Sequence, residues 1–112
     1  MLEERAIVLF CFCIDQIVNG LSKNQTSGKS YKGFIKAGLT SEDMDLFREM
    51  KLISFDEEKP NKAVWIIWKN IKDQRIQWVK DGYRIPIDCN ELKTLGPKKY
   101  KEQYLQNIEY SL

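Results

Sequence analysis

The side chains that most often carry out chemistry in proteins are scarce in this sequence. Its 112 residues include no histidine, so the chain cannot build a Ser-His-Asp or Cys-His site or bind a metal through imidazole. The three cysteines lack the spacing of zinc ligands, because Cys11 and Cys13 would point to different sides of a helix and Cys89 stands alone. We expect all three thiols to be reduced and the first two to be buried. The sequence therefore predicts a protein that is not an enzyme and that uses no metal or cofactor.

Two other patterns could in principle hold a ligand. The run Gly28-Lys29-Ser30 has the ending of a P-loop, but Lys23 stands where that motif needs its first glycine, and a helical pattern precedes it. The carboxylates between Glu42 and Glu58 could gather a hard cation, yet the spacing and the loop glycine of an EF-hand are missing. A flexible loop and a solvated acidic surface explain these segments.

Charge is distributed unevenly along the chain although its sum is small. A formal net charge of +2 is too small to imply a polyanionic partner. One stretch holds lysines and no acid, namely Lys23, Lys29, Lys32 and Lys36. The next stretch has only Arg48 and Lys51 as cations, beside Glu42, Asp43, Asp45, Glu49, Asp56, Glu57 and Glu58. After residue 58 the lysines and arginines again exceed the acids, so an acidic segment lies between two basic ones.

Length and composition predict one domain over residues 1–112, with a core over about residues 5–84 and a C-terminal helical extension over 85–112. The apolar run 6–14 is too short to cross a bilayer. It follows Glu3 and Glu4, precedes Asp15 and has no signal-peptide cleavage site. Together with the unpaired cysteines, this pattern predicts a cytoplasmic or nuclear protein that does not insert into membranes.

The first predicted element is a helix that is apolar almost all round. Spacings of three and four residues join its seam, which consists of Ile7, Phe10, Ile14, Ile17 and Leu21. Further apolar residues widen that seam, namely Val8, Leu9, Cys11, Phe12, Cys13 and Val18. Such a helix is buried on most sides. Either it is the central helix of the domain, or one of its faces meets a second copy in a homodimer.

Two further helices and a hairpin are expected next. Residues 31–37 can form one or two helical turns. Thr40 can cap a third helix through a capping box with Asp43, and the buried side of that helix would hold Met44, Phe47 and Met50. Residues 52–55 and 63–68, rich in β-branched and aromatic side chains, predict two strands joined by a turn over 56–62.

Helical signals continue to the end of the chain. Asn70 and Asp73 resemble another capping box, and the helix after them would bury Ile76, Val79 and Tyr83 before Gly82 and Pro86 stop it. A capped turn is expected over 88–95. A terminal helix should follow the pair Gly96-Pro97, with one side formed by Tyr100, Tyr104 and Ile108.

This order of elements resembles the winged-helix superfamily over about residues 5–84. The most specific part is Leu39-Thr-Ser-Glu-Asp-Met-Asp-Leu-Phe-Arg-Glu-Met-Lys-Leu-Ile-Ser-Phe55 with the turn and strand after it, which resembles the third helix and wing of MarR-type regulators. The resemblance implies an α+β fold, a helix-rich winged helix with a two-stranded wing hairpin and additional C-terminal helices. Winged helices serve in DNA readout and in protein assembly alike.

A shorter resemblance is to the first winged helix of the smallest ESCRT-II subunit. It rests on Trp65-Ile-Ile-Trp-Lys69 and on the helix end Gln77-Trp-Val-Lys-Asp-Gly82. The proline-aromatic N-terminal segment and the second winged helix of that family are absent from this sequence, so a role in membrane trafficking does not follow.

DNA binding in the MarR manner would place the exposed side of the third helix in the major groove. That side would hold Ser41, Glu42, Asp45 and Glu49. Carboxylates there repel phosphates, and only Arg48 is a good base reader. A DNA-binding transcriptional regulator is therefore the alternative function, and it would depend on Lys29, Lys32, Lys36 and Arg48, with Lys59 and Lys62 in the wing.

A protein partner suits the same surface better. The predicted function is a non-catalytic interaction module or regulator that binds a protein through Glu42, Asp45, Arg48, Glu49, Trp65 and Trp68. A basic surface on that protein would be complementary to the acids. Trp65 and Trp68 are three residues apart and would face opposite sides of a strand, so one should be exposed. The alternative is that these tryptophans and Trp78 pack together as core.

Overall fold

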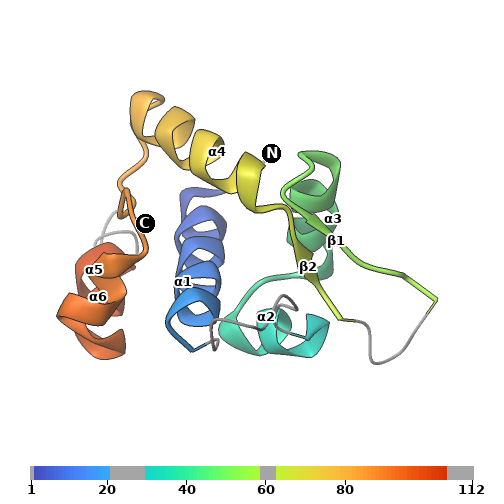
Figure 1. Ribbon diagram of the computed structural model, residues 1–112, viewed down its shortest axis with the longest axis horizontal. Coiled ribbons are helices and arrows are strands. Elements are labelled where there is room, and N and C mark those ends of the chain that lie inside the picture. The colour runs from blue at the N-terminus through green and yellow to red at the C-terminus, as the bar shows by residue number, and fades with distance from the viewer. Residues whose placement is uncertain (1, 21–29, 59–62, 106–112) are drawn as a thin grey trace.

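The structure is a computed structural model that describes residues 2–20, 30–58 and 63–105. Helices dominate it, and one small antiparallel sheet completes an α+β fold (Figure 1). The elements in chain order are α1 (Glu4–Gly20), α2 (Tyr31–Ala37), α3 (Ser41–Glu49), β1 (Ile53–Ser54), β2 (Trp65–Ile66), α4 (Trp68–Lys80), α5 (Asn90–Leu95) and α6 (Pro97–Tyr104).

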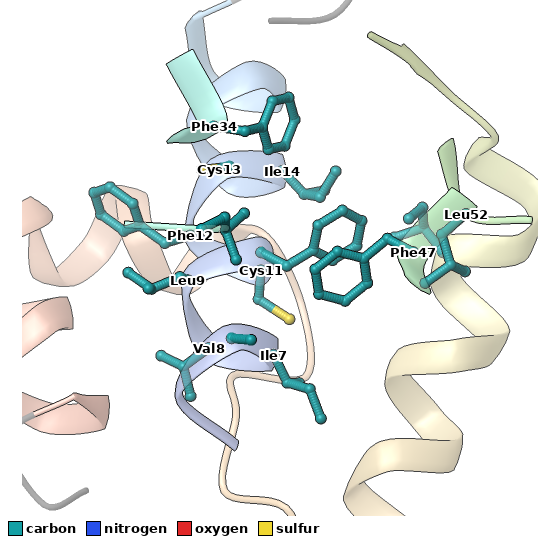
Figure 2. Packing of buried hydrophobic residues seen from close by; sticks show 14 of the residues in the cluster. Ile7, Val8, Leu9, Cys11, Phe12, Cys13, Ile14, Phe34, Phe47 and Leu52 are labelled. Atoms are coloured by element: carbon teal, nitrogen blue, oxygen red, sulfur yellow. The ribbon is translucent and has the colours of Figure 1, made fainter. Parts of the chain in front are cut away.

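Helix α1 lies at the centre of the fold, and residues 6–15 are all buried. Figure 2 shows why: Leu9 and Phe12 point to the side of α5 and α6, whereas Ile14 points to the opposite side, where Phe47 and Leu52 lie. On that side the ring of Phe10 stacks on Phe47 with centroids 4.0 Å apart. One chain thus buries α1 on all sides over residues 6–15, whereas Val18 near its end is exposed.

Helices α2 and α3 form a helix-turn-helix unit. The three-residue turn 38–40 joins them. Gly38 takes a φ of 119° there, a value that residues with a Cβ atom strongly disfavour. Thr40 then begins α3: its Oγ1 accepts from the Asp43 amide at 3.1 Å, and the Asp43 carboxylate accepts from the Thr40 amide at 3.0 Å. Both the short helix over 31–37 and the capping box are confirmed.

The predicted hairpin is present with shorter strands than expected. Ile53 pairs with Ile66, and Ser54 pairs with Trp65. The isoleucine pair is buried and the other pair is exposed, as the alternation of a strand requires. Ser30, just before α2, forms an antiparallel bridge to Ala63, so the chain entering the helix-turn-helix lies against the second strand of the hairpin.

Helix α4 corrects two expectations. It begins at Trp68 rather than near Asn70, so the strand prediction for Trp68 and the second capping box are wrong: the cap residue is Ile67, and no side chain caps it. The Asn70 amide instead donates to the Lys51 carbonyl at 2.8 Å. This hydrogen bond links the first turn of α4 to the segment that follows α3.

The buried side of α4 also differs from the predicted one. It consists of Ile71, Arg75 and Trp78, while Ile76 and Val79 are exposed. The sequence allows either set, because both have helical spacing. In the structure Trp78 is the aromatic residue of α4 that is buried. Its ring lies nearly perpendicular to the rings of Phe10 and Phe47, with centroids 6.4 Å away in each case.

The C-terminal helices close the other side of α1. Leu92, Tyr100 and Tyr104 are buried in the same apolar cluster as α1, and the ring of Tyr100 contacts Phe12 with centroids 5.3 Å apart. The core therefore extends well beyond the predicted limit near residue 84. The terminal helix is confirmed as far as Tyr104, and Ile108 lies outside the described residues.

The G38A variant should be less stable than G82A. Both glycines have positive φ, 119° and 98°, but a Cβ on Gly38 would lie 3.1 Å from the Leu9 side chain, whereas Gly82 has nothing within 4 Å. Backbone strain alone should lower the free energy of unfolding by about 1–2 kcal/mol in G82A, and crowding should add about 1 kcal/mol in G38A. Urea denaturation measures both, and equal losses would refute the contact.

Candidate interaction surface on α3 and the hairpin

The outward side of α3 is acidic. Glu42, Asp45 and Glu49 are exposed and follow one another at helical spacing, while Met44 and Phe47 on the opposite side are buried. The capping box fixes where the helix begins and hence which way each carboxylate points. Three of the predicted contact residues therefore lie together on one surface, which we call the α3 acidic face.

Arg48, the only cation of α3, is bound to other parts of the chain. Its Nη2 lies 2.5 Å from Glu57 Oε1 and 3.5 Å from Asp45 Oδ1, and its guanidinium lies 4.5 Å from the centre of the Phe55 ring. The hydrogen bond to Glu57 raises the pKa of Arg48 above its usual range. The arginine is therefore directed to the segment after β1 and is shared between Glu57 and Asp45.

The two candidate tryptophans are both exposed but belong to different surfaces. Trp65 is 49% exposed and lies opposite Ser54 on the hairpin, whose first strand contacts α3. Trp68 is 40% exposed and lines a groove of about 280 Å³ with Val18 and Ile87. The argument from opposite strand faces does not apply, because Trp68 is helical.

The alternative that all three tryptophans pack together as core is wrong for Trp65 and Trp68, and only Trp78 is a core residue. Lys32 and Lys36 are exposed one turn apart on α2. Lys29, Lys59 and Lys62 lie outside the described residues, so the basic set proposed for DNA is described only in part.

A buried polar cluster was not anticipated from the sequence. Asp15, on α1, is fully buried; Arg75 Nη1 donates to its Oδ1 at 2.6 Å, and the Tyr100 hydroxyl donates to its Oδ2 at 3.0 Å. The same guanidinium donates to the Pro86 carbonyl at 2.5 Å and 3.2 Å. The Asp15 carboxylate thus joins α1 to α4 and α6, and Arg75 links them to the segment before α5.

The cluster has the chemistry of a structural site. Burial raises the pKa of the Asp15 carboxyl, and the hydrogen bonds from Arg75 and Tyr100 oppose that rise. Burial and the neighbouring carboxylate raise the pKa of Tyr100. Two features of the sequence could have revealed the cluster. Asp15 directly follows seam residue Ile14, and Arg75 lies at helical spacing between Ile71 and Trp78.

The three thiols differ in access. Cys11 and Cys13 are buried, Cys89 is partly exposed beside the groove, and none of the three forms a disulfide. Burial raises the pKa of Cys11 to about 12. Within residues 2–20, 30–58 and 63–105, no group of three or more Cys, Asp or Glu side chains is arranged to hold a metal ion.

No family model matches the chain, and no curated protein and no solved structure matches it either. The helices in the described part of the chain include none that is long and apolar enough to span a membrane.

Thiol labelling should separate the cysteines. Native protein at neutral pH should react with iodoacetamide at Cys89, while Cys11 and Cys13 should react only after unfolding, because both are buried and burial also raises the pKa of Cys11. Peptide mass analysis assigns the sites. Equal labelling of all three in the native state, or an intramolecular disulfide, would contradict this assignment.

Breaking the buried cluster should destabilise the fold in a graded way. The R75M variant leaves the Asp15 carboxylate buried without its cation and should lose about 3–5 kcal/mol of unfolding free energy. Y100F removes one donor to that carboxylate and should lose about 1–2 kcal/mol. In the double variant D15L R75M both charges are gone, and much of the loss should be recovered. Urea denaturation distinguishes this order from equal, additive losses.

Proposed function

We propose that this protein is a non-catalytic winged-helix module, acting in the cytoplasm or nucleus, that binds a protein with a basic surface through the α3 acidic face. The observation that carries the proposal is the state of Arg48. Arg48 is shared between Asp45 and Glu57, so the three exposed acids Glu42, Asp45 and Glu49 have one already engaged cation among them, and the α3 acidic face keeps a net negative charge.

The arrangement of elements supports the winged-helix assignment. A turn of three residues between α2 and α3, a hairpin after α3, and the bridge from Ser30 to Ala63 follow the order of that fold. In DNA-binding members the equivalent of α3 enters the major groove. Here that helix would bring carboxylates to the phosphates, which disfavours DNA as the partner.

Trp65 gives the acidic face an apolar neighbour. Its side chain is half exposed on the strand that pairs with β1, and β1 in turn contacts α3. Large aromatic side chains next to a charged surface are typical anchors of protein interfaces, where the charges guide orientation and the ring provides affinity. Trp68 belongs to the groove instead and is left out of this surface.

The test compares two variants of equal charge change. Replacing Glu42, Asp45 and Glu49 by glutamine, asparagine and glutamine should weaken capture of a protein partner about tenfold. Each exposed ion pair contributes about 0.5 kcal/mol, and three such pairs together amount to about a factor of ten in affinity. The control variant carries D81N, D88N and E102Q, which neutralise exposed acids away from α3, and should capture that partner normally. Quantitative mass spectrometry of eluates reads out both.

Duplex DNA is the second arm of this experiment. The native chain should not shift a labelled duplex at physiological salt. Submicromolar, salt-dependent binding that is strengthened by neutralising the α3 acids, and lost when Lys32 and Lys36 become glutamate, would overturn the proposal in favour of a DNA-binding regulator. Partner capture unchanged by the α3 substitutions would overturn it as well.

A further inference from the structure

Helix α4 carries an apolar stripe that the rest of the described chain leaves exposed. Trp68, Ile76 and Val79 are 40%, 36% and 38% exposed, and Lys72 lies between them. Their spacings of eight and three residues place them on one side of the helix. This side is next to, but distinct from, the buried side described above, and α4 lies along one edge of the molecule (Figure 1).

The stripe continues into the groove beside Trp68. Val18 of α1 and Ile87, which precedes α5, line that groove and are 38% and 59% exposed. Five of the seven large apolar side chains exposed among the described residues thus belong to this one surface. An apolar patch of a few hundred square ångströms is at the upper end of what a monomer exposes, and such patches mark interaction sites.

Charged residues next to the stripe are complementary to a copy of themselves. Asp73 and Lys80 are exposed, and seven residues separate them, so they lie on the same flank about two helical turns apart. The point midway between them falls at Ile76 and Gln77. A two-fold axis through that point would set each Asp73 opposite Lys80 of the other copy, giving two equivalent ion pairs.

We propose that a second copy of this chain packs antiparallel on the α4 stripe, with Ile76 against its own counterpart at the axis. Val79 of each copy then lies toward the N-terminal half of the other α4, and the groove beside Trp68 borders the interface. Neither Asp73 nor Lys80 forms an ion pair within the described residues. The dimer uses no residue of the α3 acidic face, so it stands independently of the partner proposed for that face.

Sedimentation over a range of concentrations tests the dimer. The native chain should show a monomer–dimer equilibrium, and I76E should remain monomeric, because two carboxylates would meet at the axis. Ile76 is exposed in the monomer, so this variant keeps its core, which circular dichroism verifies. The matched control is I35E, which changes an isoleucine of α2 with 39% exposure and should dimerise normally.

Charge reversal tests the antiparallel register. D73K and K80D should each weaken the dimer about tenfold, since each sets like charges opposite one another twice. The double variant D73K K80D restores opposite charges at both places and should recover the native dissociation constant. A native chain that is monomeric throughout, a dimer that I76E leaves intact, or a double variant no tighter than the single ones would each overturn the proposal.

Discussion

The contact between Asp15 and Arg75 is the constraint on which the rest of this structure depends. A carboxylate in the middle of an apolar helix cannot be buried without a cation and further donors, because desolvation of a lone charge opposes folding strongly. Arg75 on α4 and Tyr100 on α6 supply them. Both helices must therefore lie against α1 at the level of Asp15. Each must also be rotated about its own axis so that Arg75 or Tyr100 faces Asp15, and this rotation determines which apolar side chains of the helix are buried.

Much of the fold was predictable because its signals are local. The extents of α1 and α2, the capping box of α3 and the existence of the hairpin all follow from residues that interact with near neighbours in the sequence. Thr40 and Asp43 illustrate this, since each satisfies a backbone amide of the other. The exposure of the α3 acids follows from the same rule, because the opposite side of that helix is plainly apolar.

The misjudged features depend on contacts between distant residues. The rotation of α4 goes with two contacts to distant residues, the pairing of Arg75 with Asp15, 60 residues away, and the packing of Trp78 on Phe10 and Phe47, and periodicity alone does not choose this side of the helix. Ile76 and Val79 have helical spacing as good as that of Ile71 and Trp78. In the same way, the direction of the Arg48 side chain depends on Glu57 and Phe55, which lie beyond the end of its own helix.

The position of the partners of Asp15 bears on how the chain reaches this state. The Tyr100 hydroxyl that donates to Asp15 is 85 residues downstream of it. Leu92, Tyr100 and Tyr104 form the last side of the core around α1. During synthesis α1 is made before the elements that cover it, and its side toward α5 and α6 stays uncovered until those two helices have been made. Transiently exposed apolar surface of this kind makes a folding chain prone to aggregation.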